Sequence, residues 1–123
     1  MTSGSRWRAL ARVCADPSEQ VAVSAIESLG LIGDLRAVPS IVGALRSPRQ
    51  SVRHAALFSA RMVRDARIVP PLIELLQDVD AVTANDAARA LARLTGRELG
   101  AEYHVWKNWW TEMGGHLPEG PEP

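Results

Sequence analysis

Apolar and polar residues follow each other along the chain with the spacing of α-helices, and the whole pattern recurs every 31 residues. Residues 16–46 align with residues 47–77 without a gap. One apolar stripe in each unit shows the helical spacing: Val21, Ala25, Ile26, Leu29 and Ile32 in the first, and Val52, Ala56, Leu57, Ala60 and Val63 in the second. A fixed period of roughly 20–50 residues is typical of solenoids, in which each unit buries its apolar face against its neighbours.

A second amphipathic segment follows in each unit and predicts another helix, at about residues 36–46 and 67–77. The break before it contains Asp34 or Asp65, whose carboxylate is suited to accept hydrogen bonds from the free amides that open a helix. Pro39 and Pro70 fall in the first turn, where a missing amide costs little. Each unit therefore reads as helix, tight turn, helix and corner.

The period also accounts for both ends of the repeat region. Residues 6–15 align with the second helix of a unit, so they predict a half repeat, and residues 78–95 predict a third first helix. A Trp-rich helix from Tyr103 to Met113 then completes a divergent third unit, 78–113, as a cap. We expect a single repeat domain over residues 1–113, all-α, forming a right-handed α–α superhelix of about five to six helices. The Gly-, Pro- and Glu-rich residues 114–123 predict a disordered tail.

Several short segments resemble the HEAT-like repeat proteins, most closely the short-repeat branch that includes the bilin-lyase-type repeats and many bacterial members. These segments are residues 33–39, 52–56, 65–73, 94–96 and 106–110. The resemblance covers about residues 6–113 and implies the fold. Members of the family include scaffolds, bilin lyases, an iron-dependent hydroxylase and DNA-alkylation-repair glycosylases, and fold likeness alone does not choose among them.

Composition says more about the cellular compartment of the protein than about its activity. Cys14 is the single cysteine of the 123 residues, which excludes an internal disulfide and fits a reducing compartment. No apolar run approaches the ~18 residues of a membrane span, and the first residues lack the apolar core of a signal peptide. We therefore expect a cytoplasmic protein. The net charge is zero, yet residues 1–67 carry ten Arg against five acids.

No catalytic, cofactor-binding or metal-binding set stands out. The histidines, His54, His104 and His116, lie too far apart in the repeat pattern to converge. Cys14 aligns with the core leucines Leu45 and Leu76, which favours a small buried residue over a nucleophile or a bilin acceptor.

The predicted function is a non-catalytic scaffold that binds a protein or peptide on its concave surface, formed by the second helices. The exposed candidates for that contact are Ser40, Gly43, Arg46, Pro71, Glu74, Gln77 and, at the cap, Trp109. One alternative is an enzyme or enzyme subunit of the bilin-lyase type. A second is DNA or RNA backbone binding through an Arg-rich strip that includes Arg46, Arg49 and Arg53.

The two ends offer further contacts. Trp106, Trp109 and Trp110 either close the end of the repeat array, with Trp106 and Trp110 on one buried face, or leave one indole exposed as an anchor for a partner. The half repeat at residues 6–15 leaves an apolar helix face uncovered, which predicts self-association there.

Overall fold

The structure, a computed structural model of the chain, describes residues 6–118. Within these residues it contains seven α-helices, two short 3-10 helices and no strand, so the predicted all-α class is confirmed. The seven α-helices are one or two more than the expected five to six. The chain forms two compact units, and the boundary between them lies between Val63 and Arg64.

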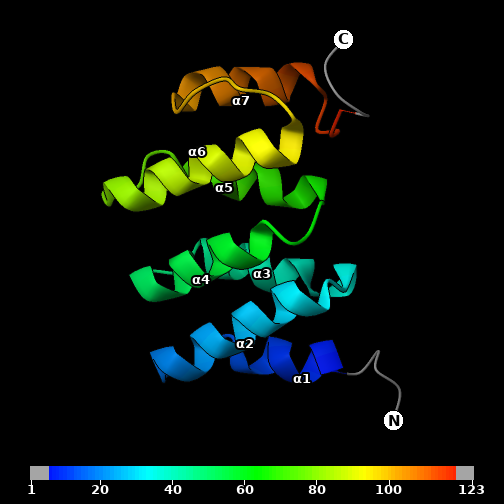
Figure 1. The fold of residues 1–123 in the computed structure, drawn as a ribbon, viewed down its shortest axis with the longest axis vertical. Helices are drawn as coiled ribbons and strands as arrows, with labels where there is room; N and C mark the ends of the chain where they lie inside the picture. Colours follow the sequence, from blue (N-terminus) through cyan, green and yellow to red (C-terminus); the bar gives the residue numbers. More distant parts are fainter. Residues whose placement is uncertain (1–5, 119–123) are drawn as a thin grey trace. The chain divides into compact units, whose positions relative to one another are not determined.

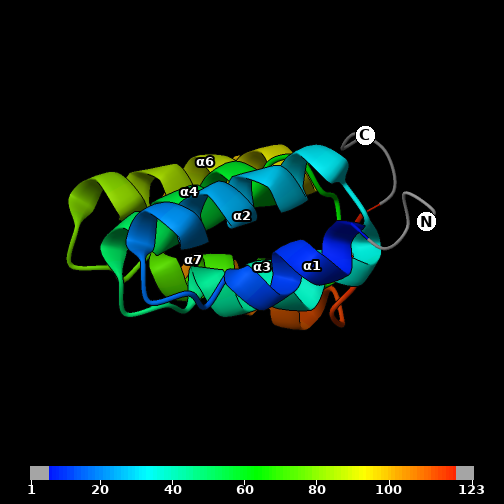
Figure 2. The same ribbon diagram turned by 90° about the horizontal axis from the view of Figure 1, so that it is seen from below.

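The first unit holds four α-helices and one 3-10 helix. These are α1 (Arg6–Val13), α2 (Glu19–Ile32), η2 (Leu35–Ala37), α3 (Val38–Leu45) and α4 (Gln50–Ala60). Helix α2 packs against α1, α3 and α4, and α3 also packs against α4. Within this unit the first helices of the repeats, α2 and α4, lie side by side in one layer, and α1 and α3 form the other (Figures 1 and 2).

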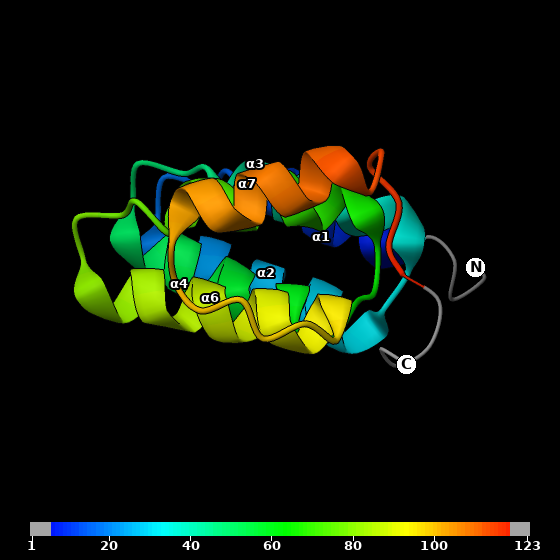
Figure 3. The same cartoon turned by 90° about the horizontal axis from the view of Figure 1, so that it is seen from above.

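The second unit holds the remaining elements. These are η3 (Ala66–Ile68), α5 (Val69–Leu75), α6 (Ala81–Thr95) and α7 (Tyr103–Glu112). Helix α5 contacts α6 on one side and α7 on another, and in this unit α6 forms one layer while α5 and α7 form the other (Figure 3). The second helices of the repeats are shorter than expected because a 3-10 turn, η2 or η3, occupies the start of each.

Both predicted aspartate caps are confirmed. One Asp34 carboxylate oxygen accepts from the backbone N–H of Arg36 at 2.9 Å, and Asp65 does the same for Arg67 at 2.9 Å. Each arginine also returns a guanidinium hydrogen bond to its aspartate. The Arg36 guanidinium lies 5.4 Å from the centroid of the Trp7 ring, which joins η2 to α1. The break before Asp34 is made by Gly33, whose φ of 70° ends α2 in the left-handed conformation that glycine adopts without strain.

The apolar stripes form the core of the first unit as predicted, with two exceptions. Ala25, Ile26 and Leu29 are buried, whereas Val21 is 44% exposed and Ile32, the last residue of α2, is 38% exposed. Val52, the repeat equivalent of Val21, is buried. The difference arises because α4 packs on α2, while the described part of the chain places no first helix on the other side of α2.

A close approach of backbones fixes the contact between α2 and α4. A Cβ added to Gly30 would lie 2.6 Å from the Cα and 2.7 Å from the Oγ of Ser59, so only glycine fits there. The buried Ser59 hydroxyl donates a hydrogen bond to the carbonyl oxygen of Ile26, one turn before Gly30. This pair of contacts satisfies a buried polar group and sets how near the two helices lie.

Residues that follow α7 return towards the start of the second unit. The Arg64 guanidinium donates to the carbonyl oxygen of Pro118 at 2.8 Å, and Pro118 is buried. Residues 114–118 of the expected disordered tail thus have defined contacts, and residues 119–123 lie outside the described residues.

Candidate functional site

The groove between α1 and α3 brings together part of the predicted binding surface. It encloses about 680 Å³ and lies on the second-helix layer of the first unit. Three of the predicted contact residues line it: Ser40, Gly43 and Arg46. A Cβ added at Gly43 would meet nothing within 4 Å, so the floor of the groove is open at this point. Arg46 is exposed at the end of α3.

Cys14 lines the same groove at the end of α1 and is half-buried, where a core position was expected. Its thiol donates to the carbonyl oxygen of Leu10 at 3.3 Å. Burial raises the pKa of the Cys14 thiol to about 11. Because the thiolate is the reactive form of cysteine, this environment makes Cys14 a poor nucleophile near neutral pH.

Of the three arginines named above for the expected nucleic-acid strip, two bind backbone carbonyls of the protein itself. Arg49 donates to the carbonyl oxygens of Asp16 and Pro17, at 2.8 and 3.3 Å. Arg53 donates to the carbonyl oxygen of Ser47 at 3.0 Å. These bonds tie together the corners before α2 and α4. Arg46 is the exposed member of the three.

The predicted contact residues of the second unit divide into exposed and buried ones. Glu74 and Gln77 are exposed at the end of α5, and Trp109 is half-buried. The expected exposure of Pro71 is wrong, because Pro71 is buried in a helix that packs against both α6 and α7.

Within the Trp cluster, Trp106 is the core residue. Its side chain is fully buried and its indole N–H donates to the carbonyl oxygen of Gly100 at 2.8 Å. The Trp109 ring meets it edge-on, with centroids 5.6 Å apart. Trp110 is only half-buried, which corrects the prediction that it shares a buried face with Trp106. Trp106 lies at the start of α7, next to the loop that returns from α6, whereas Trp110 lies one turn further along.

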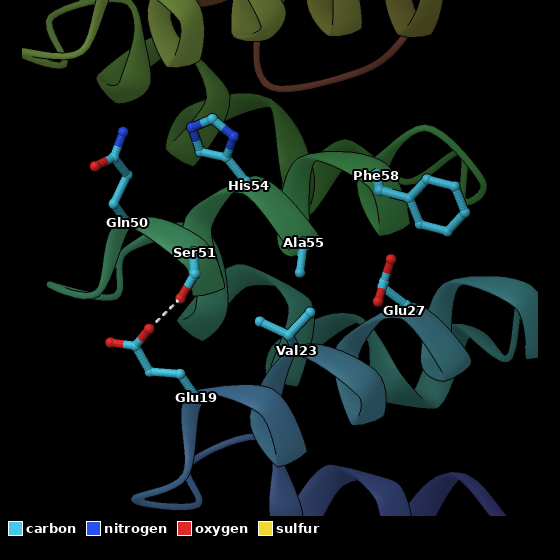
Figure 4. Close-up of a pocket in the computed structure, with 8 residues that line it drawn as sticks. All are labelled: Glu19, Val23, Glu27, Gln50, Ser51, His54, Ala55 and Phe58. Carbon is cyan, nitrogen blue, oxygen red and sulfur yellow. Dashed lines mark hydrogen bonds between the residues drawn. The ribbon is translucent and has the colours of Figure 1, made fainter.

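A second groove lies between the first helices α2 and α4 and was missed by sequence reasoning, which considered the second helices. It encloses about 730 Å³ and is lined by Glu19, Val23 and Glu27 from α2 and by Ser51, Ala55 and Phe58, among others, from α4 (Figure 4). The signal in the sequence was the four-residue spacing of the three α2 residues, which puts them on one helix face.

The described residues, 6–118, contain no group of three or more His, Cys, Asp or Glu side chains close enough together to hold a metal ion. His54 lies at the rim of the groove between α2 and α4, and His104 and His116 are exposed. None of the helices in this part of the chain has the length and apolar character needed to cross a membrane.

Comparison with known proteins agrees with the geometry. Residues 8–95 match the family model of HEAT repeats, a range that runs from α1 to the end of α6. The curated proteins contain no significant match to the chain.

Proposed function

Since the chain belongs to the HEAT-repeat family, we propose that it is a non-catalytic scaffold that binds a partner protein through the groove between α1 and α3. HEAT repeats are generally protein-interaction scaffolds. The observation that carries the proposal is that one groove of about 680 Å³ on the second-helix layer unites Ser40, Gly43 and Arg46. A groove of this size accepts a few anchoring side chains of a peptide or helix.

The non-catalytic part of the proposal is supported by the chemistry of the side chains. The raised pKa of Cys14 disfavours a thiolate, and the metal-ligating side chains of the described residues do not gather into a site. A bilin lyase would change the visible absorbance of a bilin mixed with it. We expect no such change, and a shift of the bilin spectrum would contradict the proposal.

The groove is tested by filling it. Gly43→Phe adds a ring at an exposed position of α3, where a Cβ meets no atom within 4 Å and the φ is not one that favours glycine, so we expect the fold to be kept and partner binding to be lost. Asn85→Phe adds the same ring to an exposed position of α6 and is the matched control. Affinity capture followed by mass spectrometry compares both variants with the wild type. A partner that survives Gly43→Phe as well as Asn85→Phe would show that this groove is not the binding site.

Nucleic-acid binding is tested by the same logic. Backbone binding by an arginine strip would be strongly salt-dependent. We expect no shift of duplex DNA in a gel at low salt, because Arg49 and Arg53 donate to carbonyl oxygens of the protein. A shift that Arg46→Ala abolishes would overturn this expectation.

A further inference from the structure

The groove between α2 and α4 has an apolar floor and a carboxylate at each end. Val23 and Ala55 face each other across its middle (Figure 4). At one end the Glu19 carboxylate accepts a hydrogen bond from the Ser51 hydroxyl at 2.9 Å. At the other end the Glu27 carboxylate lies near the Phe58 ring, and both side chains are half-buried. The groove therefore offers an apolar centre between two carboxylates.

The charge of this groove is opposite to that of the segment that forms it. Residues 1–63 contain eight Arg, no Lys and four acids. Asp16 and Asp34 accept hydrogen bonds from the backbone N–H groups of Ser18 and Arg36, as turn and cap residues do. The other two acids, Glu19 and Glu27, both line the groove, and none of the seven arginines between residues 7 and 63 does. The acids not used in turns thus lie together on one face.

Glu27 is the carboxylate available to a ligand. Glu19 is already joined to Ser51, whereas Glu27 makes no side-chain hydrogen bond or ion pair with any residue between 7 and 118. The adjacent Phe58 ring adds a π-face on which a guanidinium can lie. A cationic side chain at this end would therefore find both a carboxylate and an aromatic ring.

We propose that the groove between α2 and α4 binds a basic amphipathic helix of a partner protein. Glu19 and Glu27 are eight positions apart and so lie about 12 Å apart along α2, because an α-helix rises ~1.5 Å per residue. A helix lying along the groove would match this with two Arg or Lys residues eight positions apart and an apolar residue midway, over Val23 and Ala55. Binding a helix in a groove by its apolar face is a common mode of peptide recognition. This site is separate from the groove between α1 and α3 and does not depend on it.

The probe is a synthetic alanine-based helical peptide with two Arg residues eight apart and a Leu midway, labelled with fluorescein. Fluorescence anisotropy gives its Kd at low and at physiological salt. We expect binding that weakens with salt, and we expect the same peptide with Glu in place of Arg not to bind. Absence of binding by the Arg peptide at low salt, or equal binding by the Glu peptide, would overturn the proposal.

Two variants on different helices locate the binding. Glu27→Arg should raise the Kd about tenfold, because the attraction between the Glu27 carboxylate and an Arg of the peptide is replaced by a repulsion between two cations. Ser51→Arg places a cation beside Glu19 and should also weaken binding. Glu112→Arg, at an exposed position of α7, is the control and should have no effect. Ser51 and Glu112 are exposed and Glu27 is half-buried, and circular dichroism checks that the variants fold. Equal Kd values for Glu27→Arg and Glu112→Arg would refute the site.

A second copy of this chain is the competing occupant. Sedimentation equilibrium of the wild type and of Glu27→Arg, both without peptide, distinguishes a partner helix from a second copy. If the groove binds a partner helix, the two proteins should have the same mass. A dimer that dissociates on Glu27→Arg would assign the groove to self-association instead.

Discussion

At the residue scale, the equivalent aspartates Asp34 and Asp65 show how one side chain serves both a turn and a helix start. The side-chain hydrogen bond from Arg36 or Arg67 is the largest reason that the pKa of each carboxyl lies below its ordinary value. A carboxyl with a lowered folded-state pKa stabilises the fold above its unfolded-state pKa of about 3.9, and this stabilisation is lost as the pH falls through the folded-state pKa.

We therefore expect Asp34→Asn and Asp65→Asn to lower the urea midpoint of unfolding at pH 7. The gap to the wild type should narrow as the pH falls below the unfolded-state pKa of about 3.9 and towards the lower folded-state pKa of the two carboxyls. Asp86→Asn, on α6, serves as the control. A gap that stays constant over this pH range would show that the ionised form of the aspartates contributes nothing.

Cys14 gives a second prediction at this scale. Burial raises the pKa of its thiol from 9.0 to about 11, so the thiolate fraction near pH 8 falls about a hundredfold. Iodoacetamide should accordingly modify the folded protein about a hundredfold more slowly than the urea-unfolded chain, as followed by mass spectrometry. Similar rates in both states would restore Cys14 as a candidate nucleophile.

At the element scale, the contact between α2 and α4 is the most sensitive to a single atom. Gly30→Ala adds a Cβ at 2.6 Å from the Cα of Ser59, and we expect a loss of about 1–3 kcal/mol in the free energy of unfolding. Gly43→Ala, on α3, makes the same chemical change in open space and should stabilise the protein by about 0.5–1 kcal/mol. Urea unfolding measures both. If the two variants shifted stability in the same direction, the close approach would be wrong.

The capping helix α7 gives the second prediction for an element. Trp106 is fully buried and hydrogen-bonded to Gly100, so Trp106→Ala should cost about 3–5 kcal/mol. Trp110 is half-buried, and Trp110→Ala should cost clearly less. Thermal unfolding compares the two, and the reverse order would return Trp110 to the core position that the sequence suggested.

At the scale of the whole molecule, the face of α2 that α4 does not cover predicts self-association. Gln20, Ser24 and Ser28 are the repeat equivalents of Ser51, Ala55 and Ser59, which α4 presents towards α2. These residues of α2, with Val21 and with the apolar Leu10 and Val13 of α1, line a hollow of about 350 Å³. The face thus has the pattern of one that packs against a neighbouring helix.

We expect light scattering to give a mass above that of one chain at high protein concentration. Ser24→Arg should reduce that mass, because it places a charge in the middle of the hollow, and Ser40→Arg on α3 is the control. A mass of one chain at every concentration would contradict self-association.

Much of the fold could be predicted from the 31-residue period, because each repeat contains its own helix caps and apolar stripe. The helices of a repeat can therefore be predicted from the residues of that repeat alone. Asp34, Asp65 and the stripe from Val52 to Val63 behave as their spacing predicts. The exposure of single side chains was harder to predict, because it depends on which helices lie alongside. Val21 is exposed because no first helix of the described residues covers that side of α2, and Pro71 is buried in a helix that packs against α6 and α7. Likewise, the groove between α2 and α4 requires two helices to be placed together before Glu27 and Phe58 can be seen to share it.

The close approach of Gly30 to Ser59 bears on how the ligand preference of the groove between α2 and α4 can be changed. The separation of α2 and α4 is set by two residues that are themselves buried and do not line the groove. Substitutions at Glu19, Glu27 or Phe58 therefore alter what the groove attracts while leaving its width as it is. Ligand preference and helix spacing are controlled by different positions, so new specificities can be engineered at the rim without rebuilding the frame.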